Sequence, residues 1–95
     1  MDNEDVTKKV LKLFIAGPSS RSSLAISNIK HICEQYFKDA YQLEVIDIYQ
    51  QPELAEEENI IAAPTLIRND PPPVRRVVGD MTDQDRVVVM FTLDT

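Results

Sequence analysis

The sequence contains one cysteine, no tryptophan and only two glycines among its 95 residues. A single cysteine cannot form an internal disulfide, and there is no Cys-x-x-Cys motif or Cys/His cluster. The sequence therefore disfavours disulfide scaffolds, structural zinc domains and dithiol oxidoreductases, because these classes need paired cysteines or a Cys/His cluster. No apolar run approaches the roughly 20 residues of a membrane span, and residues 1–7 lack the apolar core of a signal peptide. We expect a cytoplasmic protein without a cofactor or a metal ion.

The chain carries more acidic than basic residues. Ten Lys and Arg oppose sixteen Asp and Glu, for a formal net charge of −6. This balance disfavours binding to nucleic acid or to an anionic membrane, because both attract basic surfaces. A hydrophobic share of 43% with 27% charged residues is typical of a folded domain, and the length allows one core. We predict a single domain over residues 1–95, with an ordered core from about 8 to 93.

Apolar periodicity predicts that the chain begins with a β-α-β unit. Residues 10–15 are nearly all apolar, which is typical of a strand buried on both faces. The turn at residues 16–20 precedes a helical pattern with one apolar face, and Ser22 or Ser23 can cap this helix. Residues 44–48 form a second strand, so the short connections predict parallel pairing.

The second half predicts a short helix and a hairpin. Pro52 opens the helix, which ends near Asn59. Strands are expected at residues 65–68 and 74–78. Proline cannot donate to a sheet ladder, so the hairpin connection falls at Pro71, Pro72 and Pro73.

The C-terminal segment carries conflicting signals. Thr82, with Asp85 three residues later, resembles a weak capping box and predicts a helix. Val87, Val89 and Phe91 alternate as residues of a strand do, and Leu93 continues this pattern. The two interpretations must be resolved inside one domain.

Candidates for catalysis are few. The turn at residues 16–20 could hold a phosphate, but it lacks a Gly-Lys-Ser/Thr signature and Pro18 removes one donor, which favours a plain turn. Cys33 falls on the apolar helix face and is expected in the core, whereas His31 is expected in solvent. The acidic residues 56–58 splay around a helix axis, so we expect no metal site.

Two features of the sequence are stronger functional candidates than those in the preceding paragraph. Pro64 lies between the β-α-β unit and the hairpin, where it resembles the cis-proline of the thioredoxin fold, and X-Pro is the bond type in which cis is cheap. If the two strands pair, Arg68 comes close to Val74 or Arg75 and, with Arg76, gathers three guanidinium groups at one end of the hairpin. Arginine suits carboxylate and phosphate partners, so we predict partner binding by these three arginines. Solubilising charge on an edge strand is the alternative.

Together these segments resemble the KaiB family of small cyanobacterial clock proteins, which act on the ring ATPase KaiC. The similarity runs from about Val10 to Val89 and is densest at residues 10–17, 45–48, 54–57, 63–66 and 71–80. The last block is highly specific, with three prolines, two arginines and Gly-Asp in register. The resemblance implies a thioredoxin-like β-α-β-α-β-β-α domain without thioredoxin chemistry. Serines stand where redox cysteines would be needed, at Ser19, Ser20, Ser22 and Ser23.

The resemblance also implies a function. It implies a non-enzymatic regulator that binds a KaiC-type ATPase and modulates its phosphorylation state, in circadian timing or a stress-adaptation output. The family switches between the thioredoxin-like monomer and an alternative, usually tetrameric, fold in which the C-terminal half is rewired, so a dimer or tetramer is a further expectation. We expect the switch segment to include Pro71, Pro72, Pro73, Gly79, Asp80, Met90 and Thr92.

Met90 bears on which of the two folds is expected. The family tends to carry Gly at this position, which costs roughly 0.8–1 kcal/mol relative to Ala in a helix interior, and Met is a better helix former than Gly. We therefore predict a helix in the C-terminal segment and the thioredoxin-like fold.

Departures from the family concern the partner surface. Leu24, Glu44 and Asn59 occupy positions where the family commonly carries Lys or Arg, which implies a divergent KaiC-like ATPase or a smaller basic patch. The short C-terminus points the same way. The rival hypothesis is a thioredoxin-like single-cysteine redox enzyme, which needs an accessible, low-pKa thiolate. A sensor module of a histidine kinase is a third interpretation, less expected because no kinase domain follows.

Overall fold

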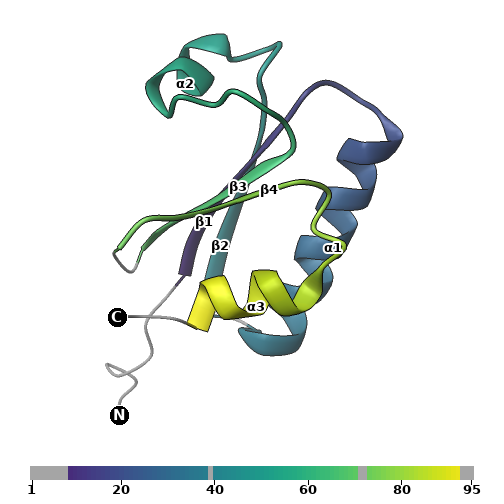
Figure 1. The fold of residues 1–95 in the computed structure, drawn as a ribbon, viewed down its shortest axis with the longest axis vertical. Helices are drawn as coiled ribbons and strands as arrows, with labels where there is room; N and C mark the ends of the chain where they lie inside the picture. Colours follow the sequence, from purple (N-terminus) through teal and green to yellow (C-terminus); the bar gives the residue numbers. More distant parts are fainter. Residues whose placement is uncertain (1–8, 39, 71–72, 93–95) are drawn as a thin grey trace.

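The computed structural model describes residues 9–38, 40–70 and 73–92 (Figure 1). The elements are β1 (Lys9–Ile15), α1 (Ser20–Tyr36), β2 (Tyr41–Asp47), α2 (Pro52–Glu57), β3 (Thr65–Asp70), β4 (Arg75–Val78) and α3 (Gln84–Thr92). This β-α-β-α-β-β-α order confirms the order predicted from the sequence. The predicted core limits at residues 8 and 93, and with them Pro71, Pro72 and Leu93, lie outside the described residues.

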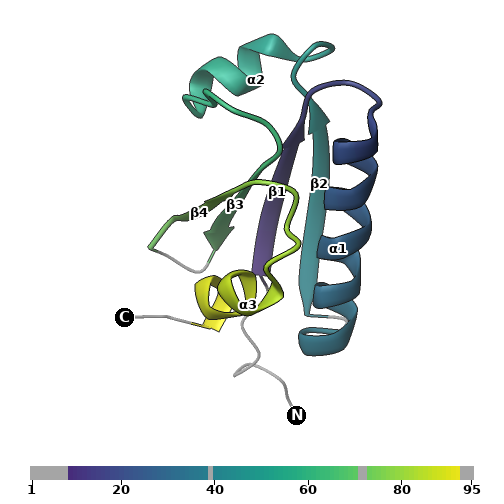
Figure 2. The same cartoon turned by 45° about the vertical axis from the view of Figure 1, so that its right-hand side comes forward.

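The four strands form one sheet in the order β2-β1-β3-β4. β1 pairs with β2 in parallel and with β3 antiparallel, and β3 pairs with β4 as an antiparallel hairpin. Helices α1 and α3 pack on one face of the sheet, while α2 lies beyond the carboxyl ends of β1 and β2 (Figure 2). The two outer strands, β2 and β4, are thus the edges of the described sheet.

Strand β1 is the centre of the core because both of its faces are covered. Leu11 and Leu13 are fully buried against α1 and α3, and Phe14 is fully buried on the opposite face with Ile46 and Ile67. Val10 and Lys12 are partly exposed and the other four residues of 10–15 are buried, so this pattern corresponds, as predicted, to a central strand that is covered on both faces.

The N-cap of α1 is Ser19, so the prediction of Ser22 or Ser23 was wrong. Ser19 has an extended backbone, and its hydroxyl oxygen accepts a hydrogen bond from the Ser22 backbone N–H at 3.0 Å. Because the helix begins one turn earlier than the apolar stripe indicated, Ser22 lies inside its first turn and is buried.

The C-terminal segment through Thr92 is a helix, and its capping residue also differs from the prediction. Asp83 caps α3, since its carboxylate accepts the Arg86 backbone N–H at 3.2 Å. Thr82 lies before the helix, where its N–H donates to the Asp80 carboxylate at 3.1 Å. The apolar side chain of Val87 is 1% exposed and packs into the core, which a helix achieves as well as a strand. No helix within the three described ranges is long and apolar enough to cross a membrane.

Candidate functional site

The turn before α1 is held by a carboxylate from the next strand. Asp47 Oδ1 accepts the backbone N–H groups of Gly17 at 3.1 Å and of Tyr49 at 2.9 Å. Gly17 has a φ of +67°, and a Cβ there would lie 3.2 Å from the Tyr49 ring, so this position requires glycine. Because Asp47 already uses the Gly17 donor, the turn fits the interpretation of a plain connection better than that of a phosphate cradle.

The Ala63–Pro64 peptide bond is cis, at the position suggested by the sequence. Pro64 is buried, and its carbonyl oxygen accepts the Gly79 N–H at 2.9 Å. The Thr65 hydroxyl donates to the Ala62 carbonyl oxygen at 2.6 Å. The first bond joins the loop before β3 to the end of β4, and the second lies within that loop.

Cys33 lies in the interior of the protein. Its side chain is fully buried on the inner face of α1, and burial, aided by the charge of Glu34, raises the pKa of the thiol to about 12. A thiolate is the nucleophilic form of cysteine, so this group is protonated and inert at neutral pH. A redox enzyme of the single-cysteine type would need the opposite environment.

The remaining polar candidates do not converge. His31 and Glu57 are exposed on different helices. Among residues 9–38, 40–70 and 73–92, no three His, Cys, Asp or Glu side chains are arranged to hold a metal ion.

The hairpin brings Arg68 and Arg75 together. They are directly paired across β3 and β4, on the sheet face that α1 and α3 cover. Arg68 is 0% exposed, and its Nη2 donates to the Pro73 carbonyl oxygen at 3.0 Å. Arg75 is half-buried. The Arg68 guanidinium is therefore an interior group that ties β3 to the hairpin connection, which the sequence pattern did not indicate.

Arg76 lies on the other face of the sheet. It pairs with Ile67, whose side chain belongs to the core cluster on the α2 side. Its guanidinium contacts Glu58, donating to the backbone carbonyl oxygen and lying 3.6 Å from the carboxylate. The three predicted arginines consequently do not share one face: Arg68 and Arg75 are neighbours, and Arg76 is separate.

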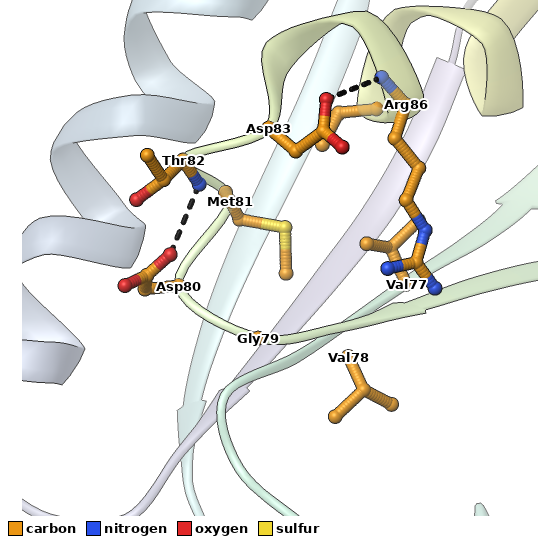
Figure 3. A pocket seen from close by; sticks show the side chains of 9 residues that line it. Val77, Val78, Gly79, Asp80, Met81, Thr82, Asp83 and Arg86 are labelled. Carbon is orange, nitrogen blue, oxygen red and sulfur yellow. Dashed lines mark hydrogen bonds between the residues drawn. The ribbon is translucent and has the colours of Figure 1, made fainter.

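A cavity of about 330 Å³ opens where β4 ends and α3 begins (Figure 3). Buried apolar side chains line its inner part, namely Val77, Met81 and Val87. Its charged residues are Asp80, Asp83 and Arg86. Two members of the expected switch segment, Gly79 and Asp80, thus line a hollow on the surface.

Hydrogen bonds fix the turn beside this cavity. The Thr82 hydroxyl, followed by the Thr82 backbone N–H, holds the pKa of Asp80 below its ordinary value. From α1, the Asn28 side-chain amide donates to the Asp80 carbonyl oxygen at 2.9 Å. Met81 is buried with a φ of +67°. Sequence reasoning missed the roles of Asn28 and Met81, and no local signal marks either one.

The fold is shared with known structures. The N-terminal domain of SasA from Synechococcus elongatus superimposes with a TM-score of 0.76 over 99% of this chain and 92% of that domain, at 21% identity. The thioredoxin Deadhead of Drosophila melanogaster gives a TM-score of 0.73 over 90% of this chain and 80% of its own, at 18% identity. Fold and site together define a thioredoxin-like domain whose lone cysteine is buried.

Sequence comparison assigns the chain to one family within this fold. Residues 12–93 match the KaiB domain family. The circadian clock protein KaiB3 of Synechocystis sp. is 46% identical over 85 residues, covering 90% of this chain and 83% of that protein. The circadian clock oscillator protein KaiB of Prochlorococcus marinus is 48% identical over 84 residues, covering 88% and 78%. The chain belongs to the KaiB family, a family of circadian clock proteins.

Proposed function

We propose that this protein is a non-enzymatic regulator in the cytoplasm that binds a KaiC-type ATPase and modulates its phosphorylation state, in circadian timing or a stress-adaptation output. The observation that carries the proposal is the location of the block that is most specific to the family. Its described part, residues 73–80, is an edge strand and the turn that follows it, and Val77 is the one residue of this part that is buried. A block buried in the core would instead indicate a role in packing.

The charges of this block support a protein partner. Arg76 keeps 39% of its side chain exposed and Arg75 is half-buried, although the whole chain carries a net charge of −6. Local basic groups on an acidic protein steer association with an acidic surface. Of the three arginines proposed for partner binding, Arg75 and Arg76 make the direct contacts, while Arg68 acts from the interior by holding the hairpin.

The proposal includes the second, rewired state and its homo-oligomer. Two residues of the expected switch segment, Gly79 and Asp80, lie beside Met81, which is a non-glycine residue with a positive φ. Such a backbone costs on the order of 1–2 kcal/mol, and its release would favour another arrangement of the C-terminal half. Two packings of one sequence need differ by only a few kcal/mol. Molar mass from light scattering distinguishes the monomer from a dimer or tetramer.

Binding is tested with purified protein and a purified KaiC-type ATPase of the same organism, with ATP or ADP present. The expected result is co-elution in size-exclusion chromatography and a changed phosphorylation time course of the ATPase. Reversing two charges, Arg75→Glu with Arg76→Glu, should slow association and reduce its dependence on salt. Lys30→Glu with Lys38→Glu, at two exposed positions on and just after α1, reverses the same number of charges and is the matched control, which should change neither. Absence of a complex with either nucleotide contradicts the proposal.

A further inference from the structure

Within the described residues, no strand pairs with the outer edge of β4. It is the last strand of the sheet, and antiparallel ladders alternate between residues whose main chain faces the neighbour and residues whose main chain faces away. The bond from the Gly79 N–H to the Pro64 carbonyl oxygen sets this alternation. By this register Arg75 and Val77 bond to β3, whereas Arg76 and Val78 direct their N–H and C=O groups outward. The edge thus offers backbone donors and acceptors to another extended chain.

The charge of the strand discriminates between possible occupants. Two of its four residues are arginines and none is acidic. A second copy of the strand would bring four arginines into one short ladder, which like-charge repulsion disfavours. An acidic segment would be attracted instead. In the described part of the chain Arg76 contacts Glu58 through Nη2, which leaves its other donors to a carboxylate of a partner.

The cavity at the end of β4 supplies an anchor point next to this edge. Val77, Val78 and Gly79 of the strand and the following turn line it, and its inner part is apolar (Figure 3). Val78 is itself 51% exposed. Three residues of extended chain span about 10 Å, which is the interval from Arg76 to Gly79. A carboxylate and an aliphatic side chain about three residues apart on one extended segment would therefore meet Arg76 and the cavity together.

We propose that the outer edge of β4 and the cavity at its end form one docking groove for an extended acidic segment of the ATPase partner. The segment adds as a fifth strand through Arg76 and Val78, places a carboxylate near Arg76 and inserts an aliphatic side chain beside Val77 and Val87. This inference rests on the proposed function, since it names the part of the partner that is recognised. Main-chain bonds provide affinity in this mode, and the cavity provides selectivity.

Amide hydrogen exchange of the protein, free and in the complex with the KaiC-type ATPase, tests the alternation directly. The amides of Arg76 and Val78 should exchange fast in the free protein and at least tenfold more slowly in the complex. The amides of Arg75 and Val77, already within the ladder, should be slow in both. Methyl signals of Val77 and Val87 should shift on binding. A complex in which residues 76 and 78 stay unprotected, or in which these methyl signals do not move, overturns the docking groove and leaves the proposed function standing.

Val78→Pro with its matched control Val78→Thr gives a second test. Among the backbone hydrogen-bonding groups of β4, proline at this position removes only the outward Val78 N–H, and proline is tolerated in edge strands when its nitrogen faces solvent. Thr keeps both the N–H and the shape of valine. We expect Val78→Pro to bind roughly tenfold more weakly than Val78→Thr, because only the proline variant lacks the outward N–H. Equal binding by both variants overturns the inference, and absence of any complex with the unmodified protein overturns the proposed function with it. If Val78→Pro does not fold, the exchange pattern of the unmodified protein decides.

Discussion

Asn28 on α1 donates its side-chain amide to the backbone carbonyl oxygen of Asp80 at 2.9 Å, across 52 positions of sequence. This bond joins the N-terminal β-α-β unit to the turn between β4 and α3, which belongs to the segment expected to rewire. A single side chain of the first half therefore helps to hold the second half in the described arrangement.

Removing this bond should weaken the fold measurably. We expect Asn28→Ala to lower the free energy of unfolding by about 1 kcal/mol, because a part-buried hydrogen bond is lost. Ser27→Ala, at an exposed position one residue earlier, is the control and should change stability much less. Chemical denaturation followed by circular dichroism measures both. Equal stability of the two variants would remove Asn28 from this role.

Thr82 should control the acid titration of Asp80. Its hydroxyl is the first cause of the lowered pKa of this carboxyl, whose ordinary value is 3.8. Thr82→Val keeps the backbone N–H and removes the hydroxyl, so the pKa of Asp80 should move up towards 3.8 in a carboxyl-carbon NMR titration. The stabilisation is complete above the ordinary pKa and is lost as the pH falls through the lower folded value. The stability difference between the variant and the unmodified protein should thus be greater at pH 7 than around pH 2.

Cys33 should resist thiol reagents in the native protein. Burial raises its pKa to about 12, so the reactive thiolate is rare at neutral pH and the sulfur is inaccessible. We expect slow labelling by iodoacetamide in buffer and fast labelling once denaturant unfolds the chain. Rapid labelling of the folded protein at pH 7 would revive the hypothesis of a single-cysteine redox enzyme.

Removing the Arg68 side chain should lower the free energy of unfolding more than removing the Arg76 side chain. Arg68→Ala deletes a fully buried side chain and its bond to the Pro73 carbonyl oxygen, so the free energy of unfolding should fall by roughly 2–4 kcal/mol. Arg76→Ala removes a partly exposed contact with Glu58 and should cost less than about 1 kcal/mol. Thermal unfolding separates the two. The opposite ranking would contradict the assignment of Arg68 to the interior.

Met90 should favour α3 through its helix propensity. We expect Met90→Gly to destabilise the helix by about 0.8–1 kcal/mol relative to Met90→Ala. Under the proposed switch, this loss should also increase the population of the rewired oligomer. Amide exchange of residues 87–92 reports on the helix, and light scattering reports on the mass. A purely monomeric Met90→Gly protein with an intact α3 would separate this position from the switch.

Much of the architecture could be predicted because local patterns and tertiary contacts agree. The apolar run at residues 10–15 lies in the doubly covered central strand, and the cis bond at Pro64 precedes a strand as proposed. The helix boundaries were less accurate, because several hydroxyl and carboxylate side chains near each helix start can serve as caps. Ser19 and Asp83 are the residues that cap the two helices, and only the backbone geometry distinguishes them from Ser22 and Thr82.

The site was harder to predict because its residues are joined by long-range contacts. Alternation along β4 does separate Arg75 from Arg76, and that signal was available in the sequence. The burial of Arg68 was not, since it depends on β3 lying between β1 and β4 and on the helices that cover that face. The bond between Asn28 and Asp80 likewise exists only once α1 and the turn have packed together.

The serine pair at the start of α1 has a consequence for protein engineering. The Ser19 hydroxyl caps the helix and also donates to the Ser22 hydroxyl at 3.0 Å, and Ser22 is 3% exposed. Replacing both serines with cysteine would remove a cap that contributes about 1 kcal/mol and would place one of the two sulfurs where no substrate reaches it. Installing an active dithiol here would require reshaping the first turn of the helix as well as exchanging two side chains.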